Sequence, residues 1–179
     1  MKYLVMGHSG SGKSSLAKLI SDSYNIPLMY LDCVHFSSNW NSRSDEEAIS
    51  MLNKFMNDND SWVVDGNYFR FILEERLQKA DKIVILLFNR FSCLVRAYKR
   101  YFKYKGKIRE SIAPGCYETM DLEFIKWILF EGRTKKRMKV FNEIINNNKD
   151  KVVVIRNQKE LDKFIEKECK IKEENKWKE

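Results

Sequence analysis

The sequence predicts an α/β fold of three layers, in which a five-stranded parallel sheet lies between helices. Short apolar runs alternate along the chain with longer segments in helical period, as in folds built from strand–helix–strand units. One run, residues 83–88, is continuously apolar, which is typical of a strand buried on both faces of a parallel sheet. A glycine-rich turn joins the first strand to the first helix. At 179 residues, the chain has the size of a single domain, 1–179.

Five apolar runs have the length and composition of strands, and the segments between them have helical period. One helix begins at a capping box, because Ser44 is followed three residues later by Glu47. Gly132 is expected to break another helical segment. The expected strands are 2–6, 28–31, 62–64, 83–88 and 151–156. The expected helices are 13–24, the one after Ser44, 69–79, 92–104, 121–147 and 158–168. The tail from residue 167 to 179 alternates acids and bases, which predicts a solvated helix end.

The glycine-rich turn is a complete phosphate-binding loop. Residues 7–14 read Gly-His-Ser-Gly-Ser-Gly-Lys-Ser, the G-x-x-x-x-G-K-S pattern in its strand–loop–helix context. Backbone N–H groups of such a loop converge on nucleotide phosphates at the helix N-terminus. Lys13 would reach the β- and γ-phosphates, and the Ser14 hydroxyl would hold Mg²⁺; His8 has no expected role. The predicted nucleotide-binding residues are Gly7, Ser9, Gly10, Ser11, Gly12, Lys13, Ser14 and Ser15.

Two aspartates follow predicted strands, at the sheet edge where ligands bind in folds of this kind. Asp32 ends the second strand, where it would orient an acceptor hydroxyl or take its proton; a phosphate acceptor would need no base. Its alternative role is that of a turn former. Asp65 ends the third strand and is predicted to contribute to the metal site with Ser14. The alternative for Asp65 is an N-cap of the following helix.

The net charge of +8 is concentrated in the second half of the chain. The segment from Arg90 to Arg109 is rich in lysine and arginine and contains no acid. Arg96 and Arg100 are four residues apart and share a helix face, and Arg133 forms a similar pair with Arg137. We predict that Arg96, Arg100 and Arg133 stabilise the migrating charge of a phosphoryl group, and that residues 100–120 close as a lid. The alternative is a solvated basic face.

Aromatic residues alternate with these basic residues, which also suits a platform for single-stranded nucleic acid. They are Tyr98, Tyr101, Phe102 and Tyr104. At helical spacing we expect them to pack inward instead, so nucleic acid is the less favoured partner.

Several classes of protein are excluded by what the sequence lacks. No stretch approaches 18 uninterrupted apolar residues, and no cleavable signal pattern begins the chain, so we expect a cytoplasmic protein without a membrane partner. The four cysteines have no zinc-site spacing and are expected to be reduced thiols. No Asn-Lys-x-Asp motif is present, which argues against a GTPase. Nothing in the sequence indicates an oligomeric state.

The chain resembles the nucleoside-monophosphate-kinase-like branch of P-loop kinases. It is most similar to the adenylate-kinase-related family known as DNA topology modulation (FlaR-like) proteins, over residues 1–157. This resemblance rests on Gly7 to Ser15, Leu31-Asp32, residues 62–68 and the basic segment with Gly106-Lys107. It implies a P-loop NTPase fold of the adenylate-kinase type with a lid.

The resemblance departs from adenylate kinases after the third strand. Those enzymes carry Asp-Gly-Phe-Pro-Arg there, with the acid near Mg²⁺ and the arginine on the acceptor phosphate. This chain has Asp65-Gly66-Asn67-Tyr68-Phe69-Arg70, without the proline and with the arginine one residue late. The resemblance therefore implies a metal-binding role for Asp65, but the acceptor-phosphate role of the arginine does not carry over to Arg70.

Together these features predict a kinase that uses ATP and Mg²⁺ to phosphorylate a nucleotide or another small acceptor. The predicted catalytic residues are Lys13, Asp32, Asp65, Arg96, Arg100 and Arg133. The acceptor would bind in an insert near residues 33–60. The alternative hypothesis is a nucleotide-dependent DNA-binding or regulatory protein that affects DNA topology.

Overall fold

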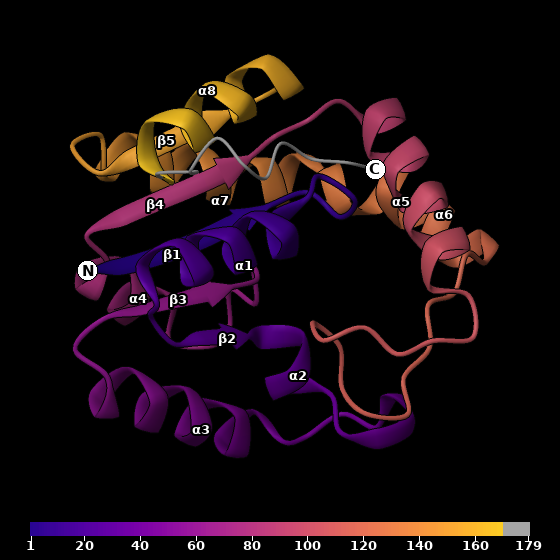
Figure 1. Ribbon diagram of the computed structural model, residues 1–179, viewed down its shortest axis with the longest axis horizontal. Coiled ribbons are helices and arrows are strands. Elements are labelled where there is room, and N and C mark those ends of the chain that lie inside the picture. The colour runs from indigo at the N-terminus through magenta and orange to yellow at the C-terminus, as the bar shows by residue number, and fades with distance from the viewer. Residues whose placement is uncertain (170–179) are drawn as a thin grey trace.

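A computed structural model describes residues 1–169 and confirms the predicted α/β architecture. Five parallel strands form one sheet in the order β2-β3-β1-β4-β5 (Figure 1). The strands are β1 (Lys2–Gly7), β2 (Leu28–Tyr30), β3 (Trp62–Asp65), β4 (Lys82–Leu86) and β5 (Val152–Ile155). The α-helices are α1 (Lys13–Tyr24), α2 (Leu31–His35), α3 (Asp45–Asp58), α4 (Leu73–Lys79), α5 (Arg90–Tyr104), α6 (Leu122–Leu129), α7 (Lys135–Asn147) and α8 (Gln158–Glu168). Two 3₁₀ turns are η1 (Ser38–Trp40) and η2 (Glu131–Arg133). The predicted tail falls outside the described residues from position 170 onward.

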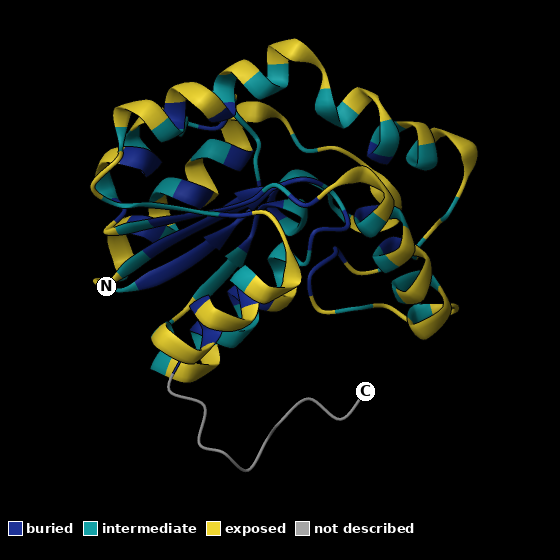
Figure 2. Ribbon diagram, turned by 90° about the horizontal axis from the view of Figure 1, so that it is seen from above, coloured by how far each residue is buried: buried dark blue, intermediate teal, exposed yellow. Residues whose placement is uncertain are grey.

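Alternating side chains of the strands separate the core into two layers. In β1, Tyr3 and Val5 pack with residues of α1, α5 and α8, whereas Leu4 and Met6 pack with α3, α4 and α7. The three central strands, β1, β3 and β4, are therefore buried on both faces, as the dark blue part of the sheet in Figure 2 shows, whereas the edge strands β2 and β5 are half-buried. A sheet covered on both faces leaves its strand ends as the places where a ligand can reach it.

Most predicted boundaries lie within two residues of those in the structure, and two differences affect residues near the strand ends. Asp32 does not end a strand, because β2 stops at Tyr30 and the chain turns at once into α2. The helix expected from residue 69 begins at Leu73, and the residues before it form a loop in which Tyr68 and Ile72 have positive φ angles of 24° and 40°. The break expected near Gly132 is present as η2.

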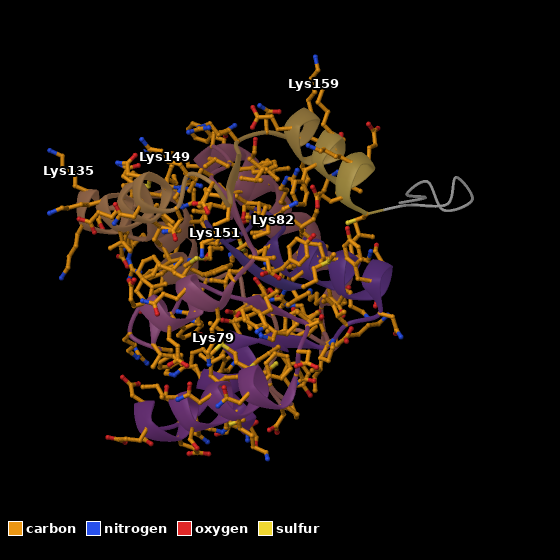
Figure 3. The ribbon with its side chains drawn as sticks, turned by 90° about the vertical axis from the view of Figure 1, so that its left-hand side faces the viewer. Lys79, Lys82, Lys135, Lys149, Lys151 and Lys159 are labelled. Atoms are coloured by element: carbon orange, nitrogen blue, oxygen red, sulfur yellow. The ribbon has the colours of Figure 1, made fainter. Side chains whose placement is uncertain are left out.

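At the edge of the sheet where the strands begin, two lysines are paired with groups of the protein itself. Figure 3 looks onto this side, where Lys82 and Lys151 lie over the ends of the strands. Lys82 forms an ion pair with Glu168 at 2.7 Å, and Lys151 donates to the carbonyl of Leu77 at 2.7 Å. These lysines stabilise the fold.

A long loop, residues 105–121, connects α5 to α6; we call it the connecting loop. It packs against η1, where the amide of Trp40 donates to Cys116 Sγ at 3.2 Å and the Cys116 thiol contacts the carbonyl of Ser37 at 3.5 Å. Ile112 and Phe36 extend this contact in a small apolar cluster. The connecting loop therefore spans from α5 to the segment after α2, past the carboxyl ends of the strands (Figure 1).

Candidate functional site: a cleft over the phosphate-binding loop

Close main-chain packing fixes the phosphate-binding loop, residues 7–14, against β4 and α5. Gly7 has φ 135°, and a Cβ at this position would lie 2.2 Å from the carbonyl oxygen of Leu86. At Gly10, with φ 76°, a Cβ would lie 2.3 Å from the carbonyl of Cys93. The amide of His8 donates to the same Leu86 carbonyl at 3.0 Å. Only glycine fits both positions.

Asn67 supports the loop from the neighbouring strand. Its side-chain amide accepts from the Gly7 N–H and donates to the Gly7 carbonyl, both at 2.9 Å. The segment around Asn67 is in turn held by Arg76, a fully buried arginine that donates to the carbonyls of Asn67 at 3.0 Å and Tyr68 at 2.8 Å. The Asp-Gly-Asn-Tyr segment thus works as a brace between β3 and the phosphate-binding loop. The sequence analysis singled out this segment as a motif, but it assigned no role to Asn67 or Arg76.

A cleft of about 950 Å³ lies over the loop at the carboxyl ends of the strands. It brings together many of the residues that the sequence analysis singled out. Those that line it are Ser9, Lys13, Ser14, Asp32, Asp65 and Arg100. Further lining residues are His35, Tyr68, Arg70, Arg109, Glu118, Trp127 and Arg137.

Lys13, Ser14 and Asp65 form the polar floor of this cleft. The Lys13 ammonium donates to the His8 carbonyl at 3.0 Å. Burial raises the pKa of Asp65 to about 6, against the opposing charge of Lys13 and a hydrogen bond from Ser14. Burial also lowers the pKa of Lys13, and the carboxylates of Asp65 and Asp32 oppose this shift. Asp65 is not an N-cap of the following helix, because α4 begins at Leu73 with Ile72 at the cap position.

The floor suits a Mg²⁺ ion. Asp65 Oδ1 is buried and has no hydrogen-bond partner among residues 1–169, next to the Ser14 hydroxyl. Magnesium prefers a few protein oxygens, with water and phosphate oxygens completing its shell. The Ser14 hydroxyl and the unpaired Oδ1 of Asp65, at the carboxyl end of β3, provide two such oxygen ligands.

Asp32 also lines the cleft, where the hydroxyl group of an aromatic side chain holds its carboxylate. The Tyr68 hydroxyl donates to Asp32 Oδ1 at 2.9 Å. The ring of His35 lies 5.2 Å from that of Tyr68, between centroids. Arg70 lies further out, where its Nε forms an ion pair with Asp45 at 2.9 Å and its Nη2 is 3.3 Å from His35 Nδ1. This part of the cleft therefore presents one oriented carboxylate, that of Asp32, next to the rings of Tyr68 and His35.

Two arginines reach the cleft from α5 and the connecting loop. Arg100 Nη2 lies 3.1 Å from Glu118 Oε2, and Arg109 Nε lies 2.5 Å from Glu118 Oε1. The Glu118 side chain is only 5% exposed. The sequence analysis singled out Arg100 but gave no role to Glu118, because a lone acid after a basic segment carries no motif.

Arg96 and Arg133 are not among the residues that line the cleft. Arg96 lies behind the loop, where Nη1 donates to the Ser11 carbonyl at 3.3 Å and Nη2 contacts Gln158. Arg133 donates to the carbonyls of Phe88 and Ile128, both at 2.9 Å. These guanidinium groups brace main-chain carbonyls around the loop.

Arg137, the partner of Arg133 in the sequence pattern, does line the cleft. Its guanidinium lies 4.5 Å from the ring centroid of Trp127, and the indole N–H of Trp127 donates to Ser9 Oγ at 3.0 Å. An arginine stacked on an aromatic ring keeps its N–H groups available. Arg133 and Arg137 do not share a helix, because Arg133 ends the 3₁₀ turn η2 whereas Arg137 belongs to α7, which begins at Lys135.

The remaining residues of the loop have different surroundings. Ser11 is buried, and its hydroxyl donates to the His8 carbonyl at 2.7 Å. Gly12 is the N-cap residue of α1, and Ser15 is exposed on that helix. Burial, together with the charges of Arg133 and Lys13, lowers the pKa of His8 to about 3, so this imidazole is neutral.

The basic helix α5 differs from expectation on its outer face. Tyr98 and Phe102 were expected to pack inward, but they are 42% and 66% exposed. The buried side of α5 is set by Cys93 and Ala97, which places Tyr98 and Phe102 on the opposite face. The inward prediction is therefore wrong for these two residues.

A family match covers the N-terminal part of the chain. Residues 3–86, which include β1 to β4 and the phosphate-binding loop, match the family described as ATPase family associated with various cellular activities (AAA). No curated protein sequence matches the chain.

No helix within residues 1–169 has the length and apolar character required to cross a membrane.

Two solved structures are similar to the chain. Shikimate kinase from Bacteroides thetaiotaomicron has a TM-score of 0.52 at 13% identity, with 93% of this chain and 95% of that one covered. A gluconokinase from Sinorhizobium meliloti 1021 has a TM-score of 0.49 at 19% identity, covering 94% and 89%. The similarity to the shikimate kinase structure thus shows that the chain shares the α/β fold of that structure.

Proposed function

We propose that the protein is a kinase that transfers the γ-phosphoryl group of ATP, with Mg²⁺, to a hydroxyl group of a small acceptor. The observation that carries this proposal is the placement of Asp32. This carboxylate lines the same cleft as Lys13 and Asp65 and is oriented by the Tyr68 hydroxyl at 2.9 Å. A negative carboxylate beside the acceptor suits a hydroxyl group and would repel an acceptor phosphate.

The residues of the cleft have complementary roles in this reaction. The loop amides and Lys13 would bind the β- and γ-phosphates, and Ser14 and Asp65 would hold Mg²⁺, which neutralises phosphate charge. The acceptor oxygen forms a bond to the γ-phosphorus as the bond from that phosphorus to the β-bridging oxygen breaks. The hydroxyl proton passes to Asp32, and ADP leaves with the electron pair of the broken bond.

Arginines around the cleft would stabilise the charge that spreads over the transferred group. Arg100 and Arg137 line the cleft and are the best placed for this role. Arg96 and Arg133 would act through the main-chain groups that they brace. In this proposal residues 100–120 are the lid and residues 33–60 the acceptor insert of a single cytoplasmic domain. Membership of the DNA topology modulation (FlaR-like) family is supported by the Asp-Gly-Asn-Tyr segment that braces the loop.

The proposal is tested by measuring ADP release with two sets of acceptors, small hydroxy compounds and nucleoside monophosphates. We expect a hydroxy compound to accelerate ADP release above the rate with ATP alone. Lys13→Ala should reduce this rate by roughly 1000-fold, because the lysine acts on charge that develops during transfer. Lys54→Ala, which changes an 80% exposed lysine on α3, is the matched control and should keep full activity. Formation of a nucleoside diphosphate from a nucleoside monophosphate, without phosphorylation of any hydroxyl group, would contradict the assignment of a hydroxyl acceptor.

A second candidate function is binding of single-stranded nucleic acid along α5. The specific observation is the exposure of Tyr98 and Phe102, whose ring centroids lie 6.2 Å apart beside Lys99 and Lys103. Exposed aromatic rings next to lysines can stack bases and contact phosphates. This function predicts oligonucleotide binding with a steep salt dependence, weakened by Phe102→Ala and unchanged by Lys13→Ala. Binding that Lys13→Ala abolishes would instead place the nucleic acid in the cleft.

A further inference from the structure

The carboxylate of Glu118 lies between two arginines inside the cleft. Its two oxygens lie 3.1 Å from Arg100 Nη2 and 2.5 Å from Arg109 Nε. The side chains of all three are largely buried, with exposures of 5%, 24% and 14% for Glu118, Arg100 and Arg109. Proteins often bind carboxylates and phosphates between two guanidinium groups in this way.

The ion pairs join two separate elements. Arg100 belongs to the helix α5, whereas Arg109 and Glu118 belong to the connecting loop. That loop is also attached on its far side, through the contact of Cys116 with Ser37 and Trp40. Glu118 therefore holds the loop down toward α5 at the edge of the cleft.

The two arginines retain capacity for another oxyanion. Each guanidinium has five N–H groups. Arg100 Nε and Arg109 Nε are buried and have no hydrogen-bond partner among residues 1–169, so the close approach of Arg109 Nε to Glu118 Oε1 is a charge contact without hydrogen-bond geometry. Two positive charges also share a single carboxylate. This group of side chains is thus incompletely satisfied, although it lines a cleft that is open to ligands.

The arginine pair lines the same cleft as Lys13, Asp65 and Asp32, the residues of the proposed reaction site. An oxyanion bound by Arg100 and Arg109 would thus lie in one cleft with both the phosphate-binding lysine and the carboxylate beside the acceptor.

We propose that Glu118 is an internal substitute for a ligand oxyanion, and that the Arg100–Arg109 pair binds an anionic group of the acceptor after displacing Glu118. The acceptor would then be a hydroxy compound that carries a carboxylate or a phosphate. Assigning the oxyanion to the acceptor rests on the proposed kinase function, whereas the competition between Glu118 and an anion does not. Displacement would also release the connecting loop from α5, which couples acceptor binding to movement of this loop.

The test is direct titration of the protein with inorganic phosphate and, separately, with acetate, in the absence of nucleotide. Glu118→Gln removes the competing charge and should raise the affinity for at least one of these anions by about tenfold, which corresponds to about 1.4 kcal/mol. The anion whose affinity rises in Glu118→Gln identifies the anionic group of the acceptor as a phosphate or a carboxylate. Glu123→Gln is the matched control, because Glu123 lines the same cleft from α6. It should leave both affinities within about twofold.

The arginines provide the second arm of the test. Adding Arg109→Ala to Glu118→Gln should abolish the gain, because one of the two guanidinium groups is lost. Equal gains in Glu118→Gln and Glu123→Gln would mean a general charge effect and would overturn the proposal, as would no gain in either. If Glu118→Gln does not fold, Glu118→Asp keeps the charge on a shorter side chain and should give a smaller gain. These titrations contain no ATP, so failure to find a kinase acceptor leaves their outcome unaffected.

Discussion

The two halves of the cleft are built in different ways. On one side, which we call the loop half, main-chain groups of residues 7–14 are fixed by contacts with β4, α5 and Asn67. On the other side, which we call the arginine half, side chains pair with one another, as Tyr68 does with Asp32 and Glu118 with Arg100. Main-chain geometry leaves little freedom, whereas paired side chains can exchange partners. The loop half is therefore rigid, and ligand-dependent change is expected in the arginine half.

The largest effect should come from Gly7→Ala, which disturbs the loop half directly. The new Cβ would lie 2.2 Å from the Leu86 carbonyl at a φ of 135°, so both the loop and β4 must shift. We expect a loss of about 3 kcal/mol or more in the free energy of unfolding, together with loss of nucleotide binding. Chemical denaturation and nucleotide titration measure the two effects.

Gly106→Ala is the matched control for that substitution. Gly106 also has a positive φ, of 71°, but a Cβ there would meet nothing within 4 Å. Only the backbone conformation is penalised, so we expect a loss of about 1 kcal/mol. Equal losses for the two variants would show that close packing does not fix the loop half.

This contrast also explains how much of the protein could be predicted from its sequence. The loop half has a sequence signature because its geometry requires glycine at fixed positions and lysine beside serine. The fold followed from the apolar runs for a similar reason, since burial on both faces leaves a continuous pattern. Asp65 was found because it follows a buried strand.

The arginine half has no such signature. Its members come together only through the path of the connecting loop, so Glu118 could not be paired with Arg100 from spacing. Arg133 and Arg137 looked equivalent on one helix face, but only Arg137 lines the cleft, because η2 interrupts the helix between α6 and α7. Asn67 was visible in the sequence, but its contact with Gly7 depends on the pairing of β1 with β3.

The next largest effect concerns the buried carboxylate at the junction of the two halves. Burial raises the pKa of Asp65 from 3.8 to about 6, so the folded protein binds a proton more readily than the unfolded chain. The contribution of this residue to stability is therefore lost as pH rises from about 4 to about 6. Asp65→Asn resembles the protonated form and should be the more stable protein at pH 7, by about 3 kcal/mol at most.

Denaturation of Asp65→Asn and the unchanged protein across this pH range measures the difference. The two stabilities should converge near pH 4, separate as the pH rises toward 6 and stay apart above it, where the unchanged protein carries the buried charge. In the same range protons should compete with Mg²⁺ for the Asp65 carboxylate, so full activity should require more Mg²⁺ at lower pH. A constant difference in stability from pH 4 to pH 7 would exclude the buried carboxylate as its cause.

The smallest effect should come from Tyr68→Phe, which removes one hydrogen bond from the arginine half. Phenylalanine keeps the ring stacked on Phe71, at 5.0 Å between centroids, but no longer donates to Asp32 Oδ1. Loss of this bond is expected to cost about 1 kcal/mol, or roughly fivefold in kcat, because the carboxylate is less well oriented toward the acceptor hydroxyl. Nucleotide affinity should be unchanged, since the loop half does not depend on this bond. Tyr104→Phe on α5 is the control and should match the unchanged protein. A loss of nucleotide affinity in Tyr68→Phe would show that the two halves are coupled through the brace between β3 and the loop, and the separation drawn between them would fail.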